Sequence, residues 1–176
     1  SSLEKLSGKS YSDNKYKSNF RVVSDHVRAS TMLITDGVLP GSDGRGYVLR
    51  RIIRRGIRNL EELGLTETSF FKLVPSVFES LGKEYPQNAS NSSLAEKLLT
   101  IEEEKFRTTL KTGLELIKKE LPKVENNLFS GHLAFKLYDT YGFPVDLTEV
   151  ILRENDIKLD HKGFESSMQK QKESSK

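Results

Sequence analysis

Apolar residues recur at helical spacing along nearly the whole of this 176-residue chain. The longest run is typical of one long amphipathic helix, with intervals of three to five positions between successive apolar residues. Its members are Leu94, Leu98, Ile101, Phe106, Leu110, Leu114, Ile117 and Leu121. Shorter runs predict helices over residues 20–35, 46–63, 70–81, 132–141 and 146–155, and another from Asp160. Because no run alternates as a strand would, we predict an all-α fold, a bundle of about six to seven helices with a long central amphipathic helix.

Glycine and proline mark the ends of several predicted helices. Gly37 follows Asp36 at the end of the first helix, and Gly64 is expected to cap the C-terminus of the second. Pro75 divides or kinks the third, since it lacks a backbone donor and its ring clashes with the preceding turn. A break in the chain is predicted at residues 85–88. Two residues can then cap the start of the long helix, Asn91 or Ser92.

The C-terminal helices carry the same kinds of signal. Ser130 is placed to start one helix, and Gly142 and Pro144 are placed to stop it. Asp146 and Glu149 have the spacing of a capping box, which predicts the start of the next helix.

Composition excludes several classes of site. The absence of cysteine excludes disulfides, a thiol nucleophile and cysteine-ligated metal centres in this chain. The three histidines are scattered, so we expect no histidine metal cluster either. No apolar run approaches the ~18 to 20 residues of a membrane span, and residues 1–17 lack the apolar segment of a signal peptide. These features predict a soluble protein of the cytoplasm with no metal site in this chain.

Positive charge is concentrated in the first third of the chain. The net charge is +3, but residues 1–65 contain 12 basic and 7 acidic residues, while the remainder is slightly acidic. We therefore predict a basic helical unit over residues 19–64 and a second helical bundle over 65–176, with a frayed end from about residue 168. Residues 1–18, which include Lys15 and Lys17, are predicted to form a mobile lead-in.

The segment from Arg45 to Arg58 contains six arginines and neither lysine nor acid. At ~100° per residue, the arginines from Arg50 onward cover about 140° of a helix, and the leucines and isoleucines lie opposite. Like charges four residues apart cost about a few tenths of a kcal/mol each, so helix stability alone does not favour this stripe. Guanidinium groups bind phosphate through paired hydrogen bonds. We interpret the stripe as a surface that binds a nucleic-acid backbone, through Arg45, Arg50, Arg51, Arg54, Arg55 and Arg58.

Other interpretations of the stripe stay open. Its arginines can be neutralised within the protein, by the acids of residues 102–104 or by Glu154 and Asp156. Alternatively, the chain is a helical interaction module that docks its arginine stripe on an acidic partner protein. A DNA-binding helix-turn-helix is a weaker alternative, because the connection over residues 36–45 is longer than the roughly 3 to 4 residues usual in that motif.

Three sequence motifs follow one another along the chain. They are Asp25-His26-Val27-Arg28 followed by Asp36-Gly37, then Gly44-Arg45-Gly46-Tyr47-Val48-Leu49-Arg50-Arg51-Ile52-Ile53-Arg54-Arg55, then Leu137-Tyr138-Asp139-Thr140-Tyr141-Gly142-Phe143-Pro144. Together they closely resemble the alanyl-tRNA synthetase family, of the bacterial type. The resemblance covers roughly residues 20–168.

The resemblance implies a role for a longer protein. This chain would be the helical middle region, which follows the class II catalytic core and precedes the editing domain. In the family this region binds the tRNA acceptor stem. The parent enzyme would attach alanine to its tRNA with ATP, so ATP, magnesium and zinc are expected for the parent and no cofactor for this chain. No catalytic residue is expected here, and the chain alone should be inactive. Its expected partners are the acceptor stem of alanine tRNA and the flanking catalytic and editing domains.

The family reads a G·U pair in the acceptor stem, and the resemblance places this reading on particular residues. Asp139 matches the aspartate of the family's Leu-Tyr-Asp motif and would accept a hydrogen bond from the guanine amino group in the minor groove. The family's asparagine before Gly-Arg-Gly-Tyr corresponds to Ser42, which is shorter and lacks the two-sided pattern of an amide. Asp43 is the nearest polar substitute. Without the resemblance, Asp139 is an ordinary surface aspartate near a helix end.

Other residues of the motifs have structural interpretations. Asp25 and Arg28 lie three positions apart on a helix and are expected to pair. Tyr138 and Tyr141 could stack on a base or ribose, but core packing is the favoured interpretation.

Overall fold

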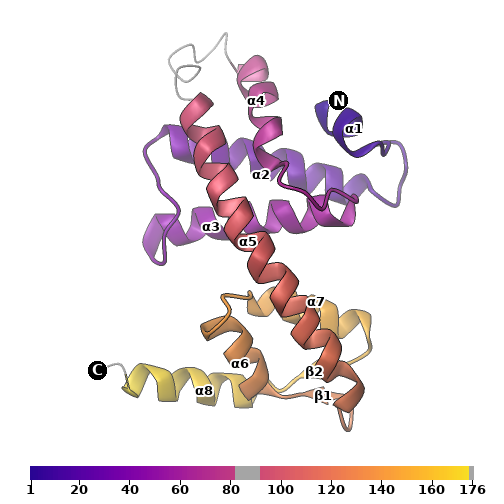
Figure 1. Ribbon diagram of the computed structural model, residues 1–176, viewed down its shortest axis with the longest axis vertical. Helices are drawn as coiled ribbons and strands as arrows, with labels where there is room; N and C mark the ends of the chain where they lie inside the picture. Colours follow the sequence, from indigo (N-terminus) through magenta and orange to yellow (C-terminus); the bar gives the residue numbers. More distant parts are fainter. Residues whose placement is uncertain (82–91, 175–176) are drawn as a thin grey trace. The chain divides into compact units, whose positions relative to one another are not determined.

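The computed structural model describes residues 1–81 and 92–174, and helices dominate it (Figure 1). The all-α prediction is confirmed, including the long helix α5, which runs from Ser92 to Glu120. The chain forms two compact units, Ser1–Phe106 and Arg107–Lys176, and α5 contributes to both.

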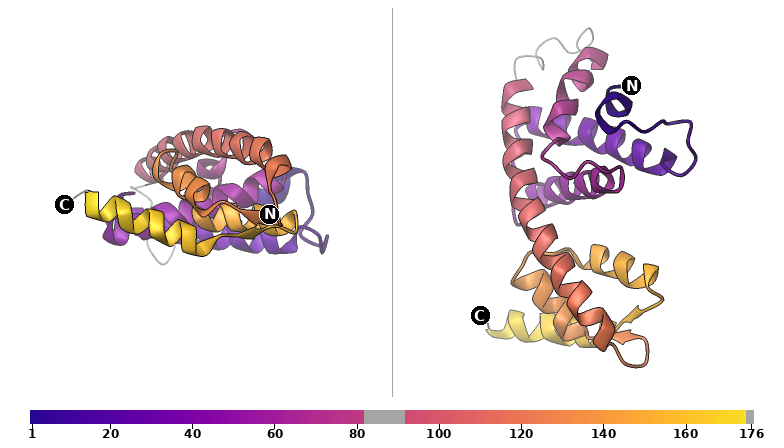
Figure 2. Two further views of the ribbon diagram at one scale, coloured as in Figure 1. Left: turned by 90° about the horizontal axis from the view of Figure 1, so that it is seen from below. Right: turned by 45° about the vertical axis from the view of Figure 1, so that its right-hand side comes forward.

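Unit 1 is built around two long helices. Its elements are α1 (Ser2–Ser7), α2 (Lys17–Thr35), α3 (Gly44–Glu62), the 3-10 turn η1 (Phe70–Leu73), α4 (Val74–Leu81) and the first part of α5. Helices α2 and α3 pack side by side (Figures 1 and 2). The apolar face predicted for α3 is buried, since Leu49, Ile53, Ile57 and Leu60 are inaccessible to solvent.

Glycine ends both long helices of unit 1, as predicted. Gly37 has φ +84° and Gly64 has φ +87°, a left-handed conformation that glycine adopts without steric cost. The residue after each glycine donates its backbone N–H back into the last helical turn. Val38 bonds to the carbonyl of Leu33 at 2.9 Å, and Leu65 bonds to that of Leu60 at 3.0 Å. These bonds satisfy carbonyl groups that a helix end leaves without a partner.

Pro75 divides the third predicted helix, as expected. The segment consists of η1 and α4, and Pro75 is the second residue of α4, where a missing N–H costs no helical hydrogen bond. The predicted break at residues 85–88 and the capping candidate Asn91 lie outside the described residues. The other capping candidate, Ser92, is the first residue of α5.

The N-terminal half of α5 buries a different seam from the predicted one. Leu94 and Ile101 are 46% and 38% exposed, so their predicted burial is wrong. The buried positions are instead Ala95, Leu99 and, unexpectedly, Glu102 and Glu103; from Phe106 the predicted seam continues through Leu110 to Ile117. A hydrophobic pattern counts neither alanine nor glutamate as a core residue, and the prediction therefore drifted to the neighbouring side of the helix.

Unit 2 combines helices with a minimal sheet. Its elements are the second part of α5, the 3-10 turn η3 (Leu121–Lys123), β1 (Leu128–Phe129), α6 (Gly131–Asp139), α7 (Val145–Glu154), β2 (Lys158–Leu159) and α8 (His161–Ser174). The two strands are parallel and pair Leu128 with Lys158 and Phe129 with Leu159. The sequence indicated neither strand. Two-residue strands are too short to produce an alternating pattern, which explains why the sequence did not reveal them.

The helix caps of unit 2 were predicted in part. The Ser130 hydroxyl accepts a hydrogen bond from the Leu133 N–H at 3.3 Å and caps α6, as expected. The prediction that Asp146 and Glu149 form a capping box is wrong, because α7 begins directly after Pro144, which occupies the N-cap position. Pro144 is extended, with φ −60° and ψ 135°, so the N-cap lies two residues before the position that the acidic pair suggests.

The structure divides the chain at residues 106 and 107, whereas the sequence suggests a boundary after residue 64. Residues 1–18, predicted as a lead-in, contain α1 and a series of turns before α2 begins at Lys17. Helix α8 continues to Ser174, beyond the point from which fraying is predicted. None of the helices in the described part of the chain is long and apolar enough to cross a membrane.

Candidate nucleic-acid interface

The loop before α3 is held tightly against the first turn of that helix. Gly44 has φ +51°, and a Cβ at Gly46 would lie 2.5 Å from the carbonyl oxygen of Leu39, so both positions require glycine. Asp43 occupies the N-cap position, but its side chain makes no capping hydrogen bond. Ser42 and Asp43 are both exposed. The two loop side chains predicted to read a base are therefore accessible at the start of α3.

The arginine stripe on α3 has two edges with different surroundings. Three members are partly buried, and we call them the inner arginines: Arg50, Arg54 and Arg58. The other three are exposed, and we call them the outer arginines: Arg45, Arg51 and Arg55. The division follows the helical geometry, since the inner arginines cover about the first 80° of the stripe and Arg51 and Arg55 lie at about 100° and 140°.

The inner arginines have acidic and aromatic neighbours within unit 1. The guanidinium group of Arg50 donates two hydrogen bonds to the Glu102 carboxylate, from Nε to Oε2 and from Nη2 to Oε1, each at 3.2 Å. Arg58 pairs with Glu62 one turn later on α3, at 3.1 Å. The internal neutralisation considered for the stripe is thus confirmed for Arg50, by one of the acids proposed for it.

Arg54 lies over the ring of Phe106, with its guanidinium carbon 5.2 Å from the ring centroid. Burial lowers the pKa of Arg54, the positive charge of Arg50 adds to this, and Glu102 opposes it. Glu102 therefore interacts with two inner arginines: it accepts hydrogen bonds from Arg50, and its negative charge favours the charged form of Arg54.

The outer arginines and their neighbours form an accessible surface. Arg51 places its guanidinium carbon 5.9 Å from the ring centroid of Tyr47, which is itself exposed. Val48, also on this side of the first turns, is 53% exposed. Positive charge, an aromatic ring and an apolar side chain thus occur together at the N-terminal end of α3, a combination suited to nucleic-acid contact.

Asp139 is the last residue of α6, in unit 2, and its side chain is exposed. A negative charge at a helix C-terminus opposes the helix dipole and is unfavourable by about 0.3 to 1 kcal/mol. Helix stability therefore gives no reason for an aspartate here. The position does leave the carboxylate accessible as a hydrogen-bond acceptor.

Comparison with known proteins identifies the family. A family model described as tRNA synthetases class II (A) matches residues 1–176. The chain belongs to this family. It is 49% identical to the alanine–tRNA ligase of Rickettsia akari over 162 residues, which are 92% of this chain and 18% of that protein. It is 44% identical to that of Hydrogenovibrio crunogenus over 155 residues, 88% of this chain and 18% of the relative. The corresponding values for Pseudoalteromonas translucida are 48% over 150 residues, 85% and 17%.

The resemblance drawn from the three motifs is confirmed at the level of the family. The chain spans less than a fifth of the length of the alanine–tRNA ligases that it matches. Within the described residues of this synthetase chain, no group of three or more His, Asp or Glu side chains is arranged to hold a metal ion.

The third motif of this synthetase chain has a clear structural part. Gly142, at φ +64°, follows the end of α6, and Phe143 is fully buried. Tyr138 packs at 6.4 Å from Phe135 and at 6.1 Å from Phe164, measured between ring centroids, which agrees with the predicted core role. These contacts fix the end of α6, and Asp139 is the exposed residue there.

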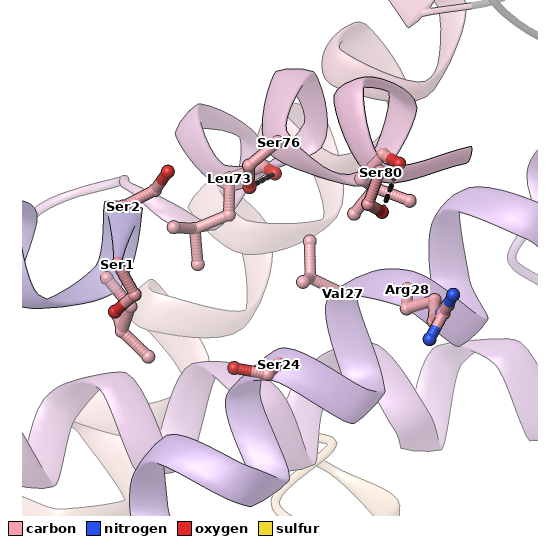
Figure 3. Close-up of a pocket in the computed structure, with 10 residues that line it drawn as sticks. Ser1, Ser2, Ser24, Val27, Arg28, Leu73, Ser76 and Ser80 are labelled. Atoms are coloured by element: carbon pink, nitrogen blue, oxygen red, sulfur yellow. Dashed lines mark hydrogen bonds between the residues drawn. The ribbon is translucent and has the colours of Figure 1, made fainter. Parts of the chain in front are cut away.

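In the first motif, Asp25 contacts His26 instead of the predicted Arg28. The carboxylate Oδ2 of Asp25 lies 3.1 Å from the ring Nδ1 of His26. Burial lowers the pKa of His26, the charge of Asp25 opposes this, and Arg55 adds to the lowering. Arg28 lies at the edge of an open hollow of about 380 Å³ between α1, α2 and α4, shown in Figure 3.

The sequence pointed only indirectly to two groups of residues in this synthetase chain. Glu103 was named only as one of several possible partners for the arginines, but it bonds to backbone groups instead. Its carboxylate accepts hydrogen bonds from the N–H groups of Ser69 at 3.0 Å and Phe70 at 2.7 Å. The second group is a set of cations around Tyr11 and Tyr16, in the stretch predicted to be a mobile lead-in. Its signal in the sequence was the interleaving of lysine and tyrosine over residues 9–17.

Proposed function

We propose that this chain forms the part of an alanine–tRNA ligase that binds and recognises the tRNA acceptor stem. Membership of the class II tRNA synthetase family and similarity to three alanine–tRNA ligases support this proposal. The observation that carries it is the set of outer arginines, which expose positive charge along one side of a well-packed helix. Packing of α3 uses its apolar face and does not require charge on this side.

The two edges of the stripe have different tasks in this proposal. The outer arginines Arg45, Arg51 and Arg55 contact phosphate groups of the acceptor stem, because exposed guanidinium groups can form two hydrogen bonds to one phosphate. The inner arginines hold α3 in place through Glu102, Glu62 and Phe106. Phosphate contacts of this kind position the RNA without selecting its sequence.

Base recognition is proposed for Asp139, Ser42 and Asp43. All three side chains are exposed, and each can accept a hydrogen bond. In the shallow minor groove of an RNA helix, the amino group of guanine is a donor, which a carboxylate matches. An exposed carboxylate would bind this donor and would be repelled by phosphates elsewhere on the RNA.

The parent activity proposed is the ATP-dependent attachment of alanine to its tRNA in the cytoplasm. Binding of ATP, magnesium and zinc would belong to other parts of the polypeptide, as the resemblance to the family implies. The partners of this chain would be the acceptor stem of alanine tRNA and the flanking catalytic and editing domains.

Charge reversal of two outer arginines tests the phosphate contacts. We expect R51E combined with R55E to weaken tRNA binding roughly 10- to 100-fold near 0.1 M salt, because two phosphates lose their partners and face like charges. The slope of log affinity against log salt should become shallower by about two. The measurement is a titration of labelled alanine tRNA at several salt concentrations.

The control for this variant is R153E, which reverses an exposed arginine near the end of α7. It should change the salt slope by less than half as much as R51E with R55E. A parallel titration with a second tRNA and with duplex DNA separates the alternatives. Equal binding of duplex DNA would favour a DNA-binding protein, and absence of binding to any nucleic acid would favour docking on an acidic protein.

Removal of the Asp139 carboxylate tests base recognition. We expect D139A to reduce the preference for a G·U over a G·C acceptor stem roughly tenfold while affinity for the G·C stem changes little, since one base-specific bond is lost. The melting temperature should stay the same or rise slightly, because a charge that opposes the dipole of α6 is removed. Equal loss of affinity for both stems, or a lowered melting temperature, would instead assign Asp139 a structural role.

A further inference from the structure

A second group of cations lies in unit 1, away from α3 in the sequence, and we call it the lysine–tyrosine cluster. Lys9 and Lys15 place their ammonium groups 5.3 and 5.2 Å from the ring centroid of Tyr16. Lys17 lies 5.6 Å from the ring centroid of Tyr11. Two rings thus gather three lysines within a stretch of nine residues.

Arg21 joins the cluster through the other end of Tyr11. Its Nε donates a hydrogen bond to the Tyr11 hydroxyl at 3.1 Å, and this bond lowers the pKa of that hydroxyl. The Tyr11 ring also meets Phe20 edge to face, at 6.0 Å between centroids and 72° between planes. Because Phe20 is buried in the core of unit 1, this contact fixes the cluster on the start of α2.

Acidic side chains do not neutralise this cluster. Within residues 1–81 and 92–174, none of its four cations forms an ion pair with a carboxylate. The acid within the stretch, Asp13, accepts a hydrogen bond from the backbone N–H of Lys15 at 2.9 Å and so caps a turn. The inner arginines of α3 differ in this respect, since Glu102 and Glu62 neutralise much of their charge.

The aromatic rings hold the lysines without cancelling their charge. An exposed cation–π contact contributes only about 0.5 to 1 kcal/mol, so a stronger anionic partner can still bind the same ammonium group. A free lysine side chain loses up to about 2 kcal/mol of rotamer entropy when it is fixed. Lysines that already rest against a ring lose less of this entropy on binding, which lowers the cost of contacting a phosphate.

The surface beside the cluster can receive such a partner. A shallow hollow of about 620 Å³ lies next to Tyr11 and Arg21 and is lined by Ser10, Ser12 and Ser24. Glu4 also lines it, and its carboxylate accepts a hydrogen bond from the backbone N–H of Tyr11 at 2.9 Å. Serine hydroxyls commonly donate to phosphate oxygens in nucleic-acid complexes. Arg21 of the cluster and three serines therefore line one open concavity, and the three lysines lie outside its lining.

We propose that the lysine–tyrosine cluster is a second contact for the backbone of tRNA, in addition to the arginine helix. Lys9, Lys15, Lys17 and Arg21 bind phosphates, and the rings of Tyr11 and Tyr16 position them. This inference rests on the proposed tRNA binding of the chain. It assigns a binding role to residues that the periodicity of the sequence left as a lead-in.

The test compares two variants of the full chain that remove the same number of lysines. The first is K9A/K15A/K17A, in which Lys15 is exposed and Lys9 and Lys17 are half-buried. The control with the same number of lysines removed is K72A/K118A/K119A, whose three lysines are exposed. Binding of labelled tRNA is measured between 50 and 200 mM salt. The first variant should reduce the salt slope by about two to three and weaken binding roughly 10-fold or more at the lowest salt, while the control changes the slope by less than one.

A pair of tyrosine variants tests the positioning role. Y16F keeps the aromatic face and should retain tRNA affinity, whereas Y16L removes it and should weaken binding about two- to fivefold while the salt slope stays within one unit of wild type. Circular-dichroism melting curves check that each variant folds. Equal affinities of Y16F and Y16L would overturn the positioning role of Tyr16.

The outcomes separate this inference from the proposed function. If R51E with R55E weakens binding and K9A/K15A/K17A does not, the cluster is no RNA contact and only this inference fails. If wild-type protein does not bind tRNA, both fail. If the matched control weakens binding as much as K9A/K15A/K17A does, the effect reflects net charge and the inference is overturned.

Discussion

Replacing Glu103 with alanine should lower the free energy of unfolding by about 3 to 5 kcal/mol, the largest single effect that we expect in unit 1. The Glu103 carboxylate is completely buried and accepts hydrogen bonds from the backbone N–H groups of Ser69 and Phe70. A bond to a charged acceptor contributes about 1.5 to 3 kcal/mol, and its loss here leaves two donors without that partner in the interior. Urea denaturation followed by circular dichroism gives the measurement.

The control is E115A, which truncates an exposed glutamate farther along the same helix. It should stay within about 0.5 kcal/mol of wild type. E103Q, which keeps one acceptor oxygen, should lie between E103A and wild type. A loss below about 1 kcal/mol for E103A would contradict the capping role of Glu103.

The effect of Glu103 extends to the arginine helix. Glu103 fixes the start of η1, where Phe70 is fully buried. A Cβ at Gly56 of α3 would lie 2.8 Å from the ring of Phe70, so this ring packs directly on the backbone of α3. Glu102, the neighbour of Glu103 on α5, holds Arg50 on the same helix. Two consecutive acids thus fix α3 from one side, and E103A should also weaken tRNA binding.

The arginine helix shows how far a sequence can predict a site. Angular spacing alone separates the apolar face from the arginine stripe, because that separation depends on the helix and on nothing else. It cannot divide the stripe into inner and outer arginines. This division depends on Glu102 and Phe106, which lie about 50 residues away in the chain.

Other features were predictable only where a single residue decides the local structure. Gly37, Gly64 and Pro75 act through their own backbone conformation, and each prediction was confirmed. The prediction of the buried seam at the start of α5 was wrong. There the Glu103 carboxylate accepts hydrogen bonds from backbone donors that are distant in the sequence, and Glu103 is therefore buried like a core residue. The lysine–tyrosine cluster lies in turns and irregular segments. Such segments have no sequence period from which the spatial neighbours of a side chain can be predicted.

Replacing Gly113 with valine should destabilise unit 2 by about 3 kcal/mol. Gly113 is buried in the middle of α5, and the ring of Phe143 occupies the place of its missing side chain, so any Cβ there would overlap the ring. Glycine in a helix interior normally costs about 1 kcal/mol relative to alanine, which indicates that this close approach outweighs helix propensity. The free energy of unfolding from urea denaturation measures the effect.

Two further variants decide whether the clash with Phe143 is the cause. T112V places valine at the preceding, half-buried position of α5 and should change stability by less than about 1 kcal/mol. Combining G113V with F143A should destabilise by clearly less than the sum of the two single effects, because the alanine opens the space that the valine needs. Strict additivity would mean that the two sites act independently. Since Phe143 follows α6 by only a few residues and Asp139 ends that helix, G113V should also disturb Asp139 and reduce the preference for a G·U stem.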